Sequence, residues 1–138
     1  MNVLLSIKPK YVEEIIKGTK RFEFRRNFVS KSNFGKIESI YIYSSSPIKK
    51  IVGFFKFKYH IEDNPQHIWK TCYKFSGINK DDFFKYFENK SIGFAIPIKD
   101  LKVFKEPIDP NDFIPNFKPP QSFCYINSIQ NQKITDYL

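Results

Sequence analysis

Apolar and polar residues at the start of the chain predict a strand followed directly by a helix. Val3–Ile7 is a short apolar run of the kind that forms a β-strand. Lys8-Pro9 ends it, because a residue that precedes proline avoids helical dihedrals and proline suits the first turn of a helix. Apolar residues then recur at helical spacing up to Gly18, a natural left-handed stop. A helix over residues 9–17 is therefore expected.

From residue 20 to residue 26 the apolar period changes from helical to alternating. Phe22 and Phe24 fall on one side of an extended chain, and three charged residues fall on the other, namely Arg21, Glu23 and Arg25. The alternation predicts a half-buried strand that carries a charged row on one face.

The remainder of the chain predicts more strands and two more helices. Strands are expected at Ile37–Ser45, Ile51–Tyr59, Ser91–Ile98, Leu101–Phe104 (an edge strand) and Ser122–Ile126. Asn64 and Asn79 are suitable N-caps, the first for a helix that ends near Gly77. Residues 106–120, with five prolines, predict an ordered loop, and the polar tail from Asn127 is expected to be mobile. We expect a single α+β domain over residues 1–138, built as a small β-barrel with flanking helices.

The net charge of +9 is placed unevenly along the 138 residues. Residues 1–60 hold 13 lysines and arginines against four acids, whereas residues 61–138 hold ten of each sign. This asymmetry indicates a surface that meets a polyanion, although a basic face kept for solubility has the same signature. The longest apolar runs are about five residues, far below the length of a membrane span, and no signal peptide is evident, so a cytoplasmic protein is expected.

The sequence contains no spacing typical of a metal or cofactor site. Cys72 and Cys124 lie far apart and predict two reduced thiols, and His60 and His67 match no zinc motif. No phosphate-binding loop, dinucleotide loop or nucleophile elbow is present. Neither a metal nor a cofactor is expected.

All three arginines of the chain lie within residues 20–26, although twenty lysines supply positive charge elsewhere. Arginine differs from lysine in its planar fork, which binds a phosphate or a base edge through two parallel hydrogen bonds. Gathering the arginines here indicates that guanidinium geometry matters. The alternative is an exposed strand of Arg–Glu–Arg ion pairs with a modest effect on stability.

The stretch from Leu4 to Arg26 closely resembles the opening of ASCH domains, the activating-signal-cointegrator homology group of the PUA-like superfamily. Weaker matches follow at Tyr43-Ser-Ser-Ser-Pro47 with Ile51-Val-Gly53, at Trp69, at Gly77-Ile-x-x-x-x-Phe-x-x-Tyr-Phe87 and at Pro119-Pro-Gln-Ser-Phe123. The resemblance implies a β-barrel with a cleft beside the first helix and the strand after it, and relatives that bind RNA or modified bases.

One branch of that group resembles an amidohydrolase that removes the acetyl group from acetylated cytidine. Its pattern is a Gly-x-Lys turn, a threonine on the next strand and a glutamate on a later strand. Lys20 matches the lysine, but Glu23 stands at the threonine position, and Val52–Phe57 offers no carboxylate. That activity is therefore not carried over. Some relatives are suspected of cutting RNA, so a metal-independent ribonuclease using Lys20, Glu23 and Arg25 remains open.

We predict an RNA-binding or modified-nucleotide-binding module with a basic cleft; DNA, and a regulatory protein partner, remain open. The residues expected at the site, by resemblance and by the arginine argument, are Lys8, Lys20, Arg21, Glu23, Arg25, Arg26, Tyr43, Ser44, Ser45, Ser46, Lys49 and Lys50. Tyr41 or Tyr43 would stack a base, and Lys56 and Lys58 would add to a salt-sensitive outer field. The alternative is a small hydrolase acting on a modified nucleoside or on RNA.

Overall fold

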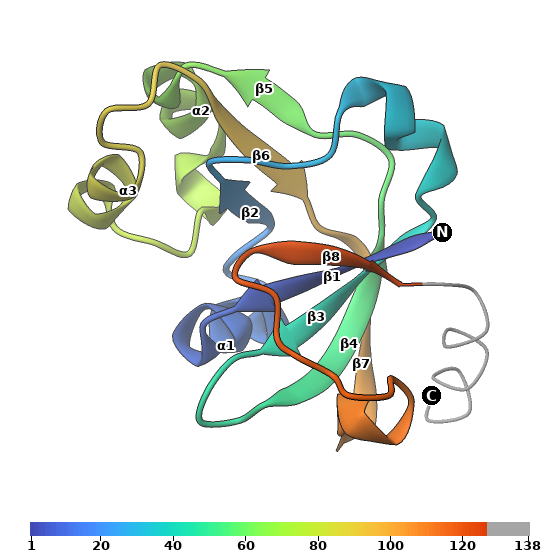
Figure 1. Cartoon of the computed structure of the whole chain (residues 1–138). Coiled ribbons are helices and arrows are strands. Elements are labelled where there is room, and N and C mark those ends of the chain that lie inside the picture. The colour runs from blue at the N-terminus through green and yellow to red at the C-terminus, as the bar shows by residue number, and fades with distance from the viewer. Residues whose placement is uncertain (127–138) are drawn as a thin grey trace.

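The computed structural model describes residues 1–126, which form two β-sheets with helices packed beside them (Figure 1). The larger sheet has five strands in the order β7-β4-β3-β1-β8. Its strands are β1 (Asn2–Ile7), β3 (Ser39–Ser44), β4 (Lys50–Lys56), β7 (Lys99–Ile108) and β8 (Phe123–Ile126). The smaller sheet has the order β2-β6-β5, with β2 (Phe22–Arg25), β6 (Gly93–Pro97) and β5 (Ile61–Asp63). β1 and β3 run parallel, and the other paired strands are antiparallel.

Within residues 1–126, three α-helices connect and cover these sheets. α1 (Pro9–Lys17) begins two residues after β1 and ends at Gly18, whose φ of 84° is left-handed. α2 (Pro65–Cys72) and α3 (Lys80–Tyr86) are separated by a 3-10 turn at Tyr73–Phe75, and further 3-10 turns lie at Lys31–Lys36 and Pro110–Asp112. Figure 1 shows α2 and α3 beside the smaller sheet and α1 beside the larger one.

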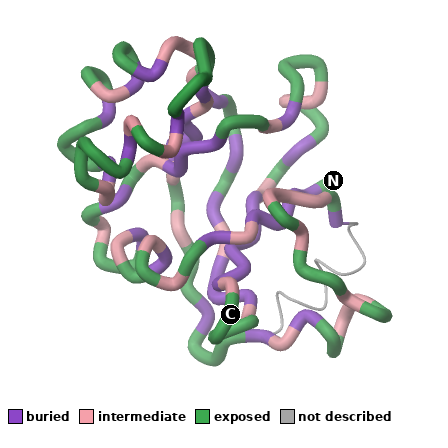
Figure 2. The backbone as a smooth tube through the Cα atoms, turned by 60° about the vertical axis from the view of Figure 1, so that its left-hand side comes forward, coloured by how far each residue is buried: buried purple, intermediate pink, exposed green. Residues whose placement is uncertain are grey.

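The apolar side chains form three clusters that follow this division. One packs α1 against a face of the larger sheet and reaches Ile96 on β6. A second covers the opposite face of the larger sheet, where Phe113 and Phe117 pack against it. The third joins α2 and α3 to the smaller sheet around Phe83, which is fully buried. In Figure 2 the buried stretches run mainly through the middle of the molecule, and many of the outer turns are exposed.

The α+β class predicted from the sequence is confirmed, but residues 1–126 do not form a closed barrel. β2 pairs with β6, whereas the neighbours of β1 are β3 and β8. The charged strand therefore belongs to a separate, smaller sheet. Arg25 on β2 donates to the backbone oxygen of Ser6 on β1, so a charged side chain lies where the two sheets meet.

Several element boundaries differ from the expected ones. β7 continues through Pro107 to Ile108, which a strand at a sheet edge tolerates because one side of its backbone needs no partner. β5 and the 3-10 turn at Lys31–Lys36 were not predicted. The expected tail from Asn127 lies outside the described residues. Within residues 1–126, no helix has the length and apolar content to cross a bilayer.

His60 is buried in a cluster of aromatic rings. Its ring centroid lies 5.7 Å from that of Phe28, 4.6 Å from that of Phe34 and 4.8 Å from that of Phe94. Its Nδ1 atom has no hydrogen-bond partner among residues 1–126. Removal from water lowers the pKa of His60, because the charged imidazolium is poorly solvated there.

Gly53 allows β4 and β7 to approach closely. A Cβ atom at this position would lie 2.3 Å from the backbone oxygen of Lys102 on β7. We therefore expect Gly53→Ala to lower the free energy of unfolding by about 1–3 kcal/mol, measured by urea denaturation. Gly35→Ala is the matched control, since nothing lies within 4 Å of its Cβ position. Equal effects of the two substitutions would contradict the close approach.

Acid should destabilise the protein partly through His60. Because its folded pKa is below the unfolded value of about 6.5, the unfolded chain takes up the proton first as the pH falls. Stability is therefore lost from about pH 6.5 downward to the folded pKa, and none of this loss occurs above that range. We expect His60→Phe to show a smaller decrease in unfolding free energy between pH 7 and pH 5 than the wild type.

The control for this measurement is His67→Gln, which removes an exposed histidine. It should keep the part of the acid-dependent loss that His60 causes. An unchanged pH dependence in His60→Phe would show that His60 is not its source.

Candidate functional site

Three charged residues of the β2 region are buried rather than exposed. Relative exposure is 2% for Lys20, 6% for Glu23 and 8% for Arg25. Charged side chains are rarely buried to this extent unless they are paired, since removing them from water is costly.

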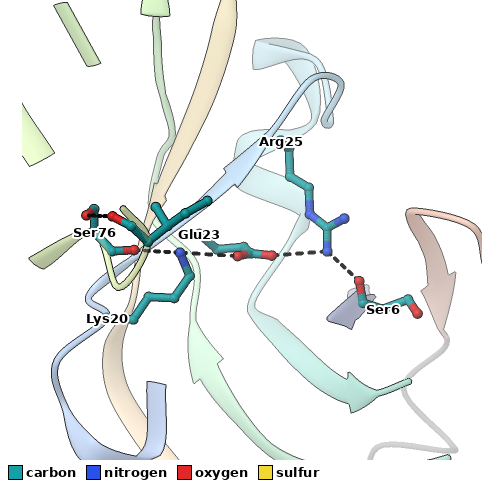
Figure 3. Close-up of polar contacts among 6 residues, drawn as sticks. Ser6, Lys20, Glu23, Arg25 and Ser76 are labelled. Atoms are coloured by element: carbon teal, nitrogen blue, oxygen red, sulfur yellow. Dashed lines mark hydrogen bonds and ion pairs between the residues drawn. The ribbon is translucent and has the colours of Figure 1, made fainter. Parts of the chain in front are cut away.

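These three residues form a linear network that runs from the segment between α2 and α3, along β2, to β1 of the larger sheet (Figure 3). The two carboxylate oxygens of Glu23 contact different cations: Oε1 lies 3.8 Å from Lys20 Nζ, and Oε2 lies 3.2 Å from Arg25 Nη2. Backbone carbonyls complete both ends. Lys20 Nζ donates to the oxygen of Ser76 at 2.7 Å, and Arg25 Nη2 donates to the oxygen of Ser6 at 2.7 Å.

The backbone at Gly77 lets Lys20 take this position. Lys20 and Ser76 form an isolated antiparallel bridge, so the backbone segments around these two residues run side by side. A Cβ atom at Gly77 would lie 2.4 Å from the Cβ of Lys20, and the φ of Gly77 is 63°. Only glycine meets both requirements at low cost. The turn between α2 and α3 is thus shaped around the lysine.

The network carries one more positive than negative charge. Burial is the main cause that lowers the pKa of Lys20, the Glu23 carboxylate opposes it, and Arg25 adds to it. Arg25 Nε has no hydrogen-bond partner among the described residues. A buried, incompletely compensated cation favours an anion beside it.

The network lies against an open cleft of about 750 Å³. The cleft extends from the end of β1 and the start of α1, across β2, to α3. Its lining residues are Ser6, Ile7, Lys8, Lys10, Tyr11, Lys20, Glu23, Phe24, Arg25, Arg26, Asn27, Ser45, Ile78, Asp82, Lys85, Tyr86, Gln121 and Ser122.

The cleft is strongly basic and has an aromatic side chain on each of two helices. Six cationic side chains line it against two carboxylates, those of Glu23 and Asp82. Tyr11 comes from α1 and lies 5.3 Å from Lys20 Nζ, measured to the ring centroid. Tyr86 comes from α3, and the guanidinium carbon of Arg26 lies 5.0 Å from its ring centroid. Such a lining suits a ligand that has both negative charge and flat rings.

Six of the twelve residues expected at the site line this cleft, namely Lys8, Lys20, Glu23, Arg25, Arg26 and Ser45. Arg21 does not. It precedes β2, is exposed, donates to the oxygen of Gly18 at 3.3 Å and lies 4.2 Å from the ring centroid of Phe75. The arginine cluster is therefore divided between the cleft and a neighbouring surface.

The other five expected residues do not line the cleft. They are Tyr43, Ser44, Ser46, Lys49 and Lys50. Tyr43 is 2% exposed and packs on Phe117 at 5.4 Å between ring centroids, and Tyr41 is 1% exposed. Both tyrosines are core residues of the larger sheet. Lys50 Nζ lies 4.0 Å from Asp109, at the opposite end of β4 from Lys56.

Sequence reasoning missed the wall that α3 contributes. Four lining residues come from the segment of the last predicted helix, for which the sequence indicated an N-cap at Asn79 and no part in a site: Ile78, Asp82, Lys85 and Tyr86. Their helical spacing does place them on one face, but nothing in the sequence indicates that this face turns toward β2. Among residues 1–126, no group of three or more histidine, cysteine or acidic side chains is arranged to hold a metal ion.

A search of protein-family profiles found none that matches the chain. A protein of Zymomonas mobilis named ASCH domain-containing ribonuclease is 24% identical over 137 residues, which span 95% of this chain and 88% of the relative.

Solved structures show the same fold. The crystal structure of ASCH from Zymomonas mobilis has a TM-score of 0.86 at 23% identity and covers 98% of this chain and 94% of that one. A tyrosine-to-phenylalanine variant of the same protein has a TM-score of 0.86 at 22% identity, covering 98% and 96%. A likeness of this extent at so low an identity identifies a shared fold, and the resemblance noted from Leu4 to Arg26 falls within it. The chain therefore has the fold of the Zymomonas ASCH structures.

Proposed function

We propose that the chain binds RNA and holds one nucleotide, ordinary or modified, in the cleft above Lys20, Glu23 and Arg25. The observation that carries the proposal is the buried network with an excess positive charge at the side of an open cleft. The cleft volume of about 750 Å³ is within the range of small-ligand sites. The Zymomonas relative is named a ribonuclease, and this name supports RNA as the class of ligand in the proposal.

The residues divide into three roles. Lys20 and Arg25 face the phosphate or a base edge, oriented by Glu23 between them. Lys8 and Arg26 add charge at the rim together with Lys10 and Lys85. Tyr11 and Tyr86 offer rings for the base, in the place that the sequence assigned to Tyr41 or Tyr43.

Asp82 is the carboxylate available to read the base. Both oxygens of Glu23 already contact cations, whereas Asp82 Oδ2 accepts from Asn79 at 3.1 Å and Asp82 is exposed. An exocyclic amine of a base donates to such a carboxylate. In this proposal Asp82, and not Glu23, therefore reads the base.

Arg25→Lys should weaken RNA binding by about tenfold or more, because an ammonium cannot reproduce the planar fork beside Glu23 and Ser6. Lys50→Ala removes a whole charge outside the cleft and should cost less. Fluorescence anisotropy with single-stranded RNA at fixed salt measures both. Circular dichroism and thermal unfolding establish that each variant is folded. Equal losses would contradict the role of guanidinium geometry.

A second candidate is a metal-independent ribonuclease, favoured by the name of the relative and by the lowered pKa of Lys20. Glu23 would take the proton of a ribose 2′-hydroxyl, whose oxygen attacks the adjacent phosphorus. The new O2′–P bond replaces the P–O5′ bond, and Lys20 gives a proton to the leaving 5′-oxygen. Arg25 stabilises the charge on the phosphoryl oxygens. A lowered pKa makes Lys20 a more ready proton donor.

Cleavage by this route yields a 2′,3′-cyclic phosphate and a 5′-hydroxyl end, in EDTA as well as in Mg²⁺. We expect Glu23→Gln and Lys20→Ala to abolish these products while thermal unfolding shows a folded protein, and Lys50→Ala to leave them unchanged. Mass spectrometry of a defined oligonucleotide identifies the ends. An intact oligonucleotide after incubation with the wild type would leave binding alone as the function.

A further inference from the structure

Lysines also gather on a surface that shares no residue with the cleft. Lys56, Lys58, Lys99 and Tyr59, together with Pro97, surround a shallow hollow beside the end of β4 and the start of β7. The three lysines are exposed, and Tyr59 is 46% exposed. We call Lys56, Lys58, Lys99 and Tyr59 the lysine patch.

Two of these lysines lie directly opposite each other in the sheet. Lys56 on β4 and Lys99 on β7 are cross-strand partners. Residues opposite each other in an antiparallel ladder have Cβ atoms about 4.5–5.5 Å apart, and like charges there repel. Lys102, the partner of Phe54 on the same pair of strands, is exposed as well.

No acidic side chain within residues 1–126 forms an ion pair with any lysine of the patch. The ion pairs of surface lysines elsewhere in this part of the chain are Lys31 with Glu62 and Lys50 with Asp109. Asp100 follows Lys99 in the chain but makes no such contact. The repulsion is therefore not relieved within the described structure.

Protection of a sheet edge accounts for only part of this arrangement. Lysines on an edge strand discourage pairing with another chain, and Lys99 lies on the edge strand β7. Lys56 lies on β4, which is paired on both sides, and Lys58 and Tyr59 follow that strand. A cluster of unpaired ammonium groups around an exposed ring matches the requirements of a nucleic-acid backbone and a stacked base.

We propose that the lysine patch is a second RNA-binding surface, which holds the phosphate backbone of a strand that extends beyond the cleft. The inference rests on the proposed RNA-binding function for the identity of the ligand, and on charge complementarity for the site. A strand that reaches both surfaces binds more tightly than one confined to the cleft, because the second contact forms at a high effective concentration.

The test compares two RNA lengths and two triple variants. The probes are a trinucleotide, sized for the cleft, and a single strand of about 20 nucleotides, longer than the roughly 4–16 nucleotides that a small binding domain covers. The patch variant is Lys56→Gln with Lys58→Gln and Lys99→Gln. The control variant makes the same change at three exposed lysines outside both surfaces, Lys74, Lys80 and Lys90.

We expect the patch variant to lose about tenfold in affinity for the long strand and to keep wild-type affinity for the trinucleotide. The slope of log K against log salt for the long strand should become shallower by about 2, since each single-strand phosphate contact contributes about 0.7. A patch variant that binds the long strand like the control variant overturns the proposal. Polyglutamate bound as tightly as RNA, with the same loss in the patch variant, overturns RNA as the ligand and indicates an acidic protein.

The Arg25→Lys variant separates this proposal from the proposed function of the cleft. If both probes bind normally to it but the patch variant loses the long strand, the cleft assignment fails and the patch assignment holds. If the wild type binds neither RNA, both fail.

Discussion

The placement of Glu23 between two cations is the interaction on which the site depends. Lys20 and Arg25 are both almost completely buried, and neither is neutralised by anything else within contact distance among the described residues. Removing Glu23 would leave two like charges in a poorly solvated region, a far larger cost than the loss of a surface ion pair. The carboxylate thus makes it possible to keep two cations beside an open cleft.

The same network links parts of the molecule that share little else. At one end Lys20 holds the backbone of Ser76, in the segment between α2 and α3, and at the other Arg25 holds Ser6 on β1. The two sheets have separate hydrogen-bond ladders, so this polar row and the cluster that includes Ile96 join them. The cleft therefore depends on the relative placement of the two sheets, and a ligand that contacts both ends of the row would stabilise that placement.

Burial changes what the arginine cluster does. An exposed row of Arg–Glu–Arg would have been screened by water and salt, with small consequences for binding. In the structure Arg25 is enclosed and oriented, Arg26 lies near the ring of Tyr86 at the cleft, and Arg21 lies over Phe75 outside it. Oriented charge of this kind needs little reorganisation when an anion arrives, which is the property shared by binding sites and catalytic sites. The lysine patch on β4 and β7 is different in kind, since its flexible ammonium groups supply a field without fixed geometry.

The sequence alone determined most of the local structure. Helix α1 and its end at Gly18, the caps at Asn64 and Asn79, and strands β1 to β4 follow from apolar period and capping chemistry, which act within a few residues. The gathering of rare arginines around Glu23 is visible in one dimension, so the sequence pointed to this stretch as a candidate site, and the resemblance added Lys20. The two-residue spacing of Tyr41 and Tyr43 places them on one face of a strand, but it could not reveal that this face of the sheet is covered by Phe117 and its neighbours.

The tertiary structure decided which charges are buried and which elements meet. Whether β2 pairs with β1 or β6 depends on contacts between residues about 70 positions apart, which no local pattern encodes. With that pairing the two sheets are separate, and the cleft lies beside β2. Tyr86 and Asp82 of α3 line the cleft, whereas Tyr43, Lys49 and Lys50 do not. Sequence period specifies the face on which a side chain lies, but the free energy of burying a charge depends on everything packed around it, and only the folded chain determines that.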